Sequence, residues 1–265
     1  MTEYKTLYPG VALVTGAANG IGQATAYAFA REGCLRIVIA DLSQSGLQET
    51  HNHIKSSFQK VEVLECPVDV GKPDDVTRLL DQAVAKFGRV DYAVNAAGII
   101  GLAQRSHEMS VDEFDRVNQV DYRGCWLCSR EELKHMIQQE PLPSHDGRPG
   151  NRGSIVNIAS QLGIVARPTA PAYNAAKAAV INMTRSDAID YSKDNIRINC
   201  VCPGLIGTRM VNDSIDYFRP AISIAPMDRV GTPDEVADCV LFLCSSKATF
   251  VQGSALVVDG GYTIN

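Results

Sequence analysis

Several features that would point to other kinds of protein are missing from this chain. Its 265 residues carry a net charge of −5 at pH 7 and contain no run of Lys and Arg. Because a nucleic-acid backbone is bound through clustered positive charge, we expect no nucleic-acid partner. No apolar stretch approaches the ~18 residues of a membrane-spanning helix, so no membrane partner is expected. The polar segment Met1 to Gly10 lacks the apolar part of a signal peptide, which favours a cytoplasmic location.

The cysteines and histidines show no spacing that is typical of a metal site. Cys125 and Cys128 form a Cys-x-x-Cys pair inside an expected helix, but a second pair is missing. Cys200 and Cys202 flank Val201 in an expected strand. Thiols in the cytoplasm are kept mostly reduced. We therefore interpret the eight cysteines as structural and expect no metal.

What the chain does contain is a regular alternation of apolar runs and helical patterns. The expected strands are 11–15, 35–40, 61–66, 91–95, 153–159, 196–201 and 254–258. The expected helices are 20–32, 43–57, 73–87, 110–138, 171–192 and 233–245. This alternation predicts an α/β protein with a Rossmann-type, doubly wound parallel sheet. With 45% hydrophobic residues, residues 1–265 are expected to form one domain.

A glycine-rich turn joins the first expected strand to the first expected helix. Gly16 allows a tight turn, Gly20 allows a pyrophosphate to approach the backbone, and Gly22 allows the helix to pack on the strand. The helix N-terminus then presents free N–H groups to an anion. Asp41 ends the next strand, where a carboxylate can bind ribose hydroxyls. The pattern predicts a dinucleotide site, although a glycine turn without a ligand is the alternative.

A second group of residues has the chemistry of proton exchange. Tyr173 and Lys177 are four residues apart and therefore share one face of an expected helix. A cation next to a phenol favours its ionised form, and such a phenol can exchange a proton with an alcohol or carbonyl oxygen. Ser160, thirteen residues before Tyr173, supplies a hydroxyl for the same oxygen. Tyr-x-x-x-Lys also occurs by chance in helices, so the trio gains weight from its context.

These motifs together resemble the short-chain dehydrogenase/reductase family, in its compact branch of about 250 residues. The resemblance runs nearly from end to end, through the glycine turn, Asp69-Val70, Asn95-Ala96-Ala97-Gly98, Ser160, Tyr173 with Lys177, Pro203-Gly204, Thr208 and Asp259-Gly260-Gly261. It implies an oxidoreductase that interconverts an alcohol and a ketone, with Tyr173 exchanging the proton and Ser160 holding the oxygen. It also implies that Lys177 assists Tyr173 and binds the nicotinamide ribose, and that the chain forms a homotetramer or dimer.

The resemblance further implies a set of cofactor contacts. Asp69 and Val70 correspond to contacts with the adenine, and Asn95 to a residue that steadies the sheet beside the cofactor. Ile206 and Thr208 correspond to contacts with the nicotinamide carboxamide. The remaining expected cofactor-binding residues are Gly16, Asn19, Gly20, Ile21, Asp41, Leu42, Ala96, Ala97, Gly98, Tyr173, Lys177, Pro203 and Gly204.

The choice between NAD and NADP depends on Asp41. Its carboxylate would repel the 2′-phosphate of NADP, by on the order of 1–3 kcal/mol. Relatives that prefer NADP carry a basic residue at one of two places, which here hold Asn19 and Leu42. We therefore predict NAD, with a distant arginine such as Arg36 as the feature that would weaken this prediction.

Asp121 departs from the family pattern, because the family usually has an asparagine there that holds a water beside the lysine. Counting from Phe114 and Gly124 aligns Asp121, and not Asn118, with that asparagine. The aspartate would keep Lys177 protonated. Either Asp121 replaces the asparagine as a working member of the catalytic set, or the proton relay of this chain is weakened.

The substrate is expected to be a hydrophobic alcohol or ketone. The pocket walls are expected from 99–103, 161–164 and the substrate segment 205–229, which contains Met210, Ile215, Tyr217, Phe218, Ile222, Ile224 and Met227. Arg209 is the nearest candidate for binding an anionic group, and 205–229 is the expected mobile lid. Ordinary packing is the alternative for these apolar residues.

A polar stretch, Pro141 to Gly153, resembles an insertion and is expected to be a surface loop. With it, the chain is similar to fungal members of the family that act in secondary metabolism. Two other functions stay open: a non-redox cyclase or isomerase on the same scaffold, and a catalytically silent NAD-binding protein.

Overall fold

A seven-stranded, entirely parallel sheet forms the centre of the protein, with the strand order β3-β2-β1-β4-β5-β6-β7. This computed structural model describes residues 6–212 and 215–264. The order reverses between β1 and β4, as in a doubly wound sheet, and confirms the predicted fold class. The strands are β1 (Val11–Thr15), β2 (Arg36–Asp41), β3 (Glu62–Pro67), β4 (Tyr92–Asn95), β5 (Gly153–Ile158), β6 (Ile196–Pro203) and β7 (Ala255–Val258).

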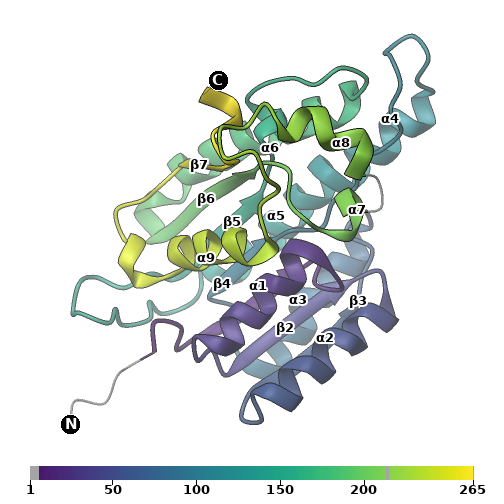
Figure 1. Ribbon diagram of the computed structural model, residues 1–265. Helices are drawn as coiled ribbons and strands as arrows, with labels where there is room; N and C mark the ends of the chain where they lie inside the picture. The colour runs from purple at the N-terminus through teal and green to yellow at the C-terminus, as the bar shows by residue number, and fades with distance from the viewer. Residues whose placement is uncertain (1–5, 213–214, 265) are drawn as a thin grey trace.

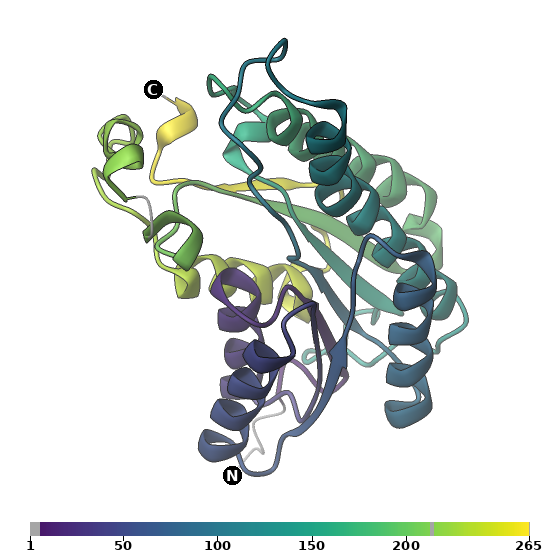
Figure 2. The same cartoon turned by 90° about the vertical axis from the view of Figure 1, so that its right-hand side faces the viewer.

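Helices cover both faces of the sheet (Figures 1 and 2). One face is packed by α1 (Gly20–Arg31), α2 (Gln44–Ser57) and α9 (Pro233–Cys244). The other face is packed by α3 (Pro73–Phe87), α5 (Cys125–Met136) and α6 (Pro171–Asp190). Neighbouring residues of β1 enter opposite cores: Ala12 and Val14 pack under α1, whereas Val11 and Leu13 pack under α3. A strand buried on both faces tends to be apolar along most of its length, which is why β1 has no polar alternation.

The prediction of one continuous helix over 110–138 is wrong. It consists of α4 (Val111–Asn118), one π-helical turn η1 (Gln119–Gly124) and α5. Ser110 caps α4 by accepting a hydrogen bond from the Glu113 amide. Single π-helical turns inside helices occur mostly at functional sites, and this one contains the buried Asp121.

The segment before β5 is a surface loop, and it lies far from α8. Within it, the Leu142 amide donates to the Asn151 carbonyl oxygen at 2.9 Å. Arg148 reaches out of the loop to Thr249 Oγ1 and to the carbonyl oxygen of Ser246. The loop enters β5 at its amino end, at the lower left of Figure 1. It therefore lies at the edge of the sheet opposite the carboxyl ends of the strands.

The substrate segment contains two short helices, α7 (Arg209–Asn212) and α8 (Ile215–Ile222). Among the described residues, no helix is both long and apolar enough to cross a membrane. All eight cysteines lie in the described part of the chain, and none of them forms a disulfide. The described residues also contain no cluster of three or more side chains that could bind a metal.

Candidate active site

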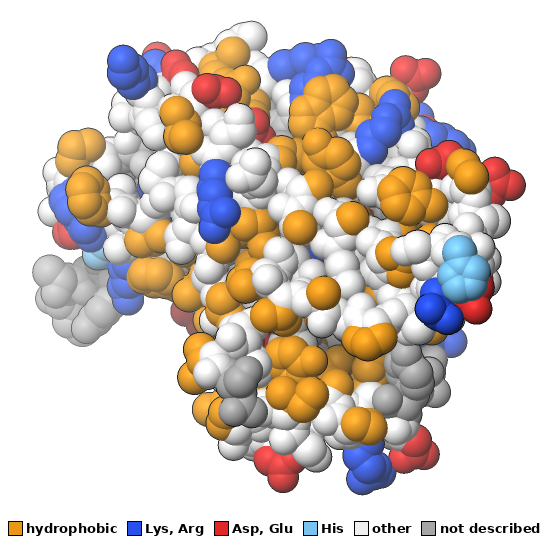
Figure 3. All heavy atoms as spheres, turned by 90° about the horizontal axis from the view of Figure 1, so that it is seen from above, with side chains coloured by type: hydrophobic (Ala, Val, Ile, Leu, Met, Phe, Trp, Pro, Cys, Tyr) orange, Lys and Arg blue, Asp and Glu red, His pale blue; other side chains and the backbone are white. Residues whose placement is uncertain are grey.

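The carboxyl ends of the strands border a cavity of about 420 Å³. A cavity of this size is within the usual range for small-molecule sites. In Figure 3, hydrophobic side chains gather over the middle of the face that carries α8, with charged side chains mainly towards its rim. The expected site residues that line the cavity are Gly16, Asn19, Gly20, Ile21, Asp41, Leu42, Asp69, Val70, Ala96, Ala97, Gly98, Ser160, Tyr173, Lys177, Pro203, Gly204, Ile206 and Thr208.

The glycine turn brings backbone rather than side chains to the cavity. Gly16 has a φ of +67°, and a Cβ on it would lie 2.7 Å from the Ala97 nitrogen. A Cβ on Gly22 would lie 2.2 Å from the Gly16 carbonyl oxygen, so only glycine allows α1 to approach β1. Asn19 precedes α1 without a side-chain cap, and the first turn of α1 has no acidic residue. The N–H groups at this helix end are thus available to an anion.

Asp41 is held in a fixed position at the end of β2. Its Oδ2 accepts from the Ala18 amide at 3.1 Å, and its Oδ1 accepts from the Ser43 amide at 2.9 Å. Arg36 lies at the other end of β2 and donates to the Pro9 carbonyl oxygen at 2.7 Å. Arg36 therefore does not neutralise Asp41.

Ser160, Tyr173 and Lys177 lie on one wall of the cavity. Ser160 begins the short helical turn η2 (Gln161–Gly163), and its Oγ accepts from the Leu162 amide at 3.1 Å. Because that bond uses the serine as an acceptor, its O–H remains available for donation. Tyr173 and Lys177 occupy the first turns of α6, and the Lys177 ammonium lies 5.6 Å from the centre of the Tyr173 ring. The two side chains therefore lie on one face of a helix, as their i, i+4 spacing predicts.

Lys177 and Asp121 form a buried ion pair. Lys177 Nζ lies 3.6 Å from Asp121 Oδ2, and the two side chains are 6% and 0% exposed. Lys177 also donates to the Ile158 carbonyl oxygen at 3.1 Å. Burial lowers the pKa of Lys177, but the nearby ionisable groups, Asp121 first among them and then Tyr173, together outweigh it, so that the pKa lies above its ordinary value. Asp121 Oδ1 accepts from the Ile99 amide at 2.8 Å, which joins the pair to the segment after β4.

Asn95 and Asp121 are not among the described residues that line the cavity; both lie behind its wall. The Asn95 side-chain amide donates to Asn157 Oδ1 at 3.0 Å and to Glu132 Oε2 at 3.1 Å. It thus joins β4 to β5 and to α5, which agrees with a role in steadying the sheet. Glu132 is fully buried, and burial raises the pKa of its carboxyl to about 8, although the hydrogen bond from Asn95 lowers it. The sequence analysis did not identify Glu132, because the helical pattern around it indicates only that this face of the helix is buried.

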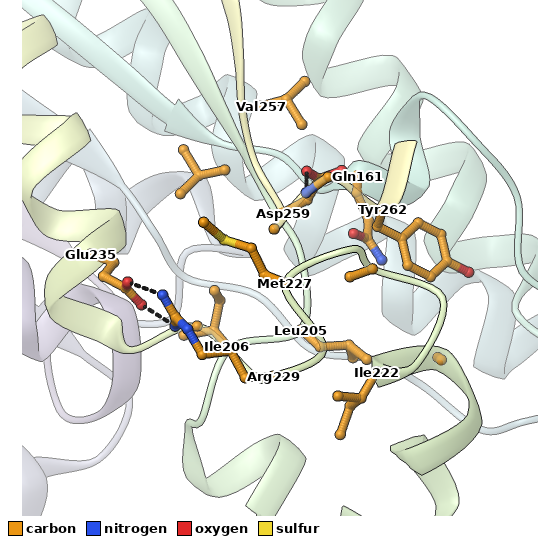
Figure 4. Close-up of a pocket in the computed structure, with 16 residues that line it drawn as sticks. Gln161, Leu205, Ile206, Ile222, Met227, Arg229, Glu235, Val257, Asp259 and Tyr262 are labelled. Carbon is orange, nitrogen blue, oxygen red and sulfur yellow. Dashed lines mark hydrogen bonds and ion pairs between the residues drawn. The ribbon is translucent and has the colours of Figure 1, made fainter. Parts of the chain in front are cut away.

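A second cavity of about 310 Å³ adjoins the first. Gln161, Leu205 and Ile206 line both cavities. Figure 4 shows that the second cavity lies between the substrate segment, β7 and the C-terminal turn. At its edge, Arg229 donates to both oxygens of Glu235, at 2.9 and 2.6 Å.

The substrate segment contributes Leu205, Ile206, Thr208, Val211 and Phe218 to the first cavity. The side chains of Met210, Ile215 and Tyr217 lie outside the described residues. Arg209, the expected candidate for binding an anionic group, is not among the described residues that line either cavity. Arg167 lines the first cavity instead. It precedes α6 by four residues in an irregular segment, where no periodic pattern in the sequence could have indicated its direction.

Proteins named as dehydrogenases are similar to nearly the whole of this chain. A family model described as "Enoyl-(Acyl carrier protein) reductase" matches residues 16–263. The short-chain dehydrogenase srdC of Neurospora crassa is 39% identical, with 96% of this chain and 97% of that protein covered. The 2-(R)-hydroxypropyl-CoM dehydrogenase of Xanthobacter autotrophicus is also 39% identical, with 96% and 98% covered.

Two solved structures are similar over nearly the whole chain. Levodione reductase superposes with a TM-score of 0.89 at 32% identity, covering 97% of this chain and 98% of that one. A 3-ketoacyl-(acyl-carrier-protein) reductase from Brucella melitensis, complexed with NADH, has a TM-score of 0.85 at 32% identity, with 97% and 99% covered.

Proposed function

The chain belongs to the short-chain dehydrogenase/reductase family, and we propose that it is an NAD(H)-dependent oxidoreductase that interconverts a secondary alcohol and a ketone on a largely hydrophobic small molecule. The observation that carries the proposal is the wall formed by Ser160, Tyr173 and Lys177 beside an uncapped helix N-terminus in one cavity. The family uses a nicotinamide cofactor, which supplies or accepts the hydride when it is bound.

The residues of the cavity fit such a cofactor. The pyrophosphate would be held by the N–H groups of the glycine turn and the first turn of α1, where neither a side-chain cap nor an acidic residue competes. Asp41 would accept from the adenosine ribose hydroxyls, with Leu42, Asp69 and Val70 beside the adenine. The nicotinamide end would lie near Ile206 and Thr208. The observation that supports this fit is the backbone cradle at Gly16, which a side chain would fill.

We favour NAD over NADP because Asp41 carries an unbalanced negative charge at the ribose end. The backbone amides of Ala18 and Ser43 donate to its carboxylate. A 2′-phosphate would meet this charge at close range, at a cost on the order of 1–3 kcal/mol. Lys72, the cation beside the adenine end, is itself 3.6 Å from Asp69 Oδ2.

The roles proposed for the catalytic residues follow from their contacts. Tyr173 gives or takes the proton of the substrate oxygen. Ser160 donates its free O–H to that oxygen and stabilises negative charge that develops there. The Lys177 ammonium has three donors, of which one faces Ile158 and one faces Asp121. The third is available to the nicotinamide ribose, while Asp121 keeps the ammonium charged.

We further propose a fungal, cytoplasmic role in secondary metabolism; the likeness to a short-chain dehydrogenase of Neurospora crassa supports the fungal part of this proposal. The chain is expected to form a homotetramer or dimer. Phe114, Tyr122 and Trp126 are 43%, 39% and 42% exposed on α4, η1 and α5, and an exposed aromatic surface of this kind is typical of an interface.

The test is to titrate NADH and NADPH separately, by nicotinamide fluorescence, and then to add hydrophobic ketones and secondary alcohols. We expect tighter NADH binding, and oxidation of NADH on addition of a ketone. Tyr173→Phe is the matched control, because it should still bind NADH and lose turnover by ~10²-fold or more. Tight NADH binding without turnover across the panel would contradict the redox proposal and favour the silent or non-redox alternatives.

A further inference from the structure

Gln161 stands at the junction of the two cavities, and the proposed mechanism gives it no role. It directly follows Ser160, and it lines both the cavity that contains Tyr173 and the second cavity. Gln161 is 4% exposed. Within the described part of the chain, its side-chain oxygen Oε1 is buried and has no hydrogen-bond partner. Because a buried polar atom without a partner costs free energy, a ligand group that pairs with Oε1 gains from the contact.

The position of Gln161 is fixed by the fold. Its carbonyl oxygen accepts from the Ile164 amide at 2.9 Å in the turn η2. A Cβ on Gly163 would lie 2.7 Å from the Lys177 carbonyl oxygen, so η2 packs closely on the catalytic helix α6. At the end of β6, a Cβ on Gly204 would lie 2.9 Å from Gln161 Oε1. The carboxamide is therefore held between η2 and the end of β6, beside the catalytic wall.

The second cavity offers apolar walls and charges that are already bonded. Ile222 and Ala225 line it from the substrate segment. At its edge, the Arg229 guanidinium is bonded to both oxygens of Glu235. The two oxygens of Asp259 accept from backbone amides of the C-terminal turn, each at 2.8 Å. A ligand that enters this cavity therefore meets mainly hydrocarbon and needs no charge of its own.

The carboxamide of Gln161 selects the ligand group by its hydrogen-bonding chemistry. Figure 4 shows it directed into the second cavity. An amide oxygen only accepts hydrogen bonds, and an amide nitrogen only donates them. A hydroxyl does both, so it satisfies the carboxamide in either orientation that rotation about the last side-chain bond allows. An ether oxygen cannot donate to Oε1, and a hydrocarbon leaves it unpaired.

From this arrangement we infer that the substrate is a hydroxy ketone, or the corresponding diol, whose second hydroxyl bonds to Gln161 and whose apolar chain occupies the second cavity. This inference rests on the proposed function and names its substrate class. In the reduction, the ketone carbon receives a hydride from NADH and its oxygen receives a proton from Tyr173, which gives the diol and NAD⁺. The second hydroxyl keeps its oxidation state and orients the molecule.

The test compares ketones that differ only in the group offered to Gln161. The compounds are 3-hydroxynonan-2-one and 4-hydroxynonan-2-one, their methyl ethers, and nonan-2-one. For wild-type enzyme with NADH, we expect kcat/KM to favour the better hydroxy ketone over nonan-2-one and over its own ether by ~10-fold or more. Gln161→Met keeps the length of the side chain without its hydrogen-bonding atoms. It should remove this preference, mainly through the KM of the hydroxy ketone, and leave nonan-2-one unchanged.

Gln104→Met is the matched control. Oε1 of Gln104 is likewise buried without a partner among the described residues, but Gln104 lines neither cavity. This variant should keep the wild-type preference. The inductive effect of the hydroxyl on the carbonyl is the same in every variant, so it cancels when variants are compared. Unchanged NADH affinity and far-UV circular dichroism show that each variant is folded, and Gln161→Ala serves if Gln161→Met is not.

Ala225→Leu tests the second cavity separately, because a larger side chain there fills part of it. It should lower kcat/KM for 3-hydroxynonan-2-one by roughly 10-fold, the worth of about two buried methylenes, and leave 3-hydroxybutan-2-one unchanged. An equal loss with both compounds would show that the chain of the substrate does not enter this cavity, and would overturn that part of the inference. The role of Gln161 is overturned if wild-type enzyme reduces the hydroxy ketones, ethers and nonan-2-one equally well. It is also overturned if Gln161→Met keeps the preference or loses all the compounds to the same extent.

Failure of the proposed function gives a different result, namely no NADH oxidation with any of these ketones. In that case the hydroxy ketones and nonan-2-one are titrated into NADH-loaded protein by calorimetry. Binding of a hydroxy ketone that weakens by ~5-fold or more in Gln161→Met, while that of nonan-2-one does not, keeps the hydroxyl site. Equal binding by wild type and variant removes it.

Discussion

Glu132 gives the sharpest test of the structure that supports the site. Its carboxyl is 0% exposed in the core beneath α5, and Oε2 accepts from the Asn95 side-chain amide at 3.1 Å. No cation is within ion-pair distance of it among the described residues. Burial without a counter-charge favours the neutral form, and the pKa of Glu132 is raised from 4.5 to about 8.

The sign of the effect on stability follows from proton counting. Between pH 4.5 and about 8 the folded protein keeps the proton of Glu132, whereas the unfolded chain has released it. Stability therefore falls as pH rises through this window and is constant above it. A shift of this size corresponds to on the order of 5 kcal/mol across the whole window, at 1.36 kcal/mol for each pH unit.

Glu132→Gln should remove this dependence. Glutamine keeps an oxygen that accepts from Asn95, but it has no proton to lose. We expect the free energy of unfolding of the variant to exceed that of the wild type increasingly as pH rises from 5.5 to 8. Urea unfolding followed by circular dichroism at several pH values measures this difference. Asp91 and Asp121, whose pKa values are also raised by burial, contribute equally to both proteins and cancel in the difference.

Glu131→Gln is the matched control on the same helix. The Glu131 side chain is also largely buried, at 6% exposed, but it is paired with Arg130 and Lys134 at 2.8 Å. This variant should keep the wild-type fall in stability between pH 5.5 and 8. Parallel pH profiles of wild type and Glu132→Gln would refute the reasoning, because Glu132 would then be ionised in the folded protein.

Three further predictions concern the site and the assembly. Asp41→Ala should reduce the preference for NADH over NADPH by ~10-fold or more, measured as a ratio of Kd values; an unchanged ratio would exclude Asp41 as the selector. Asp121→Asn should shift the pH profile of alcohol oxidation to lower pH, because removing a negative charge favours ionisation of nearby acids; an unchanged profile and rate would contradict any role of Asp121 in the relay. Gel filtration should show an oligomer, and Trp126→Lys should dissociate it; a wild-type species of single-chain size would exclude the assembly.

The fold could be predicted from the sequence because its strands leave little ambiguity. β1 is buried along its whole length and is therefore read as an apolar run. The π-helical turn η1 could not be predicted, because the step from an i+4 to an i+5 hydrogen bond leaves no mark on a 3.6-residue pattern. The alignment of Asp121 did not depend on helical geometry, since it rested on the spacing from Phe114 to Gly124, and the structure has Asp121 beside Lys177.

The parts of the site that come from strand ends were predictable, and the parts that come from loops were not. Parallel strands end at one edge, so Asp41 and Ser160 were expected to meet there. Arg167 reaches the cavity because of the Thr169 backbone and the contact with Phe218 in α8. The contact with Phe218 is not local to the sequence around Arg167. The second cavity escaped prediction for the same reason, as it lies between segments 205–229 and 255–262.

The buried pair of Lys177 and Asp121 shows why an aspartate suits this chain. Lys177 is 5% exposed, and a buried ammonium without a counter-charge tends to lose its proton. Its backbone partner, the Ile158 carbonyl, supplies only a dipole, so nearby negative charge, that of Asp121 first, is what keeps the pKa of Lys177 high. The same carboxylate accepts from the Ile99 amide and thereby joins the segment after β4 to α6 behind the cavity wall. The fold therefore fixes the charge of Lys177 before any ligand binds. The pH profile of the enzyme should show a joint titration of Lys177 and Asp121 rather than two independent titrations.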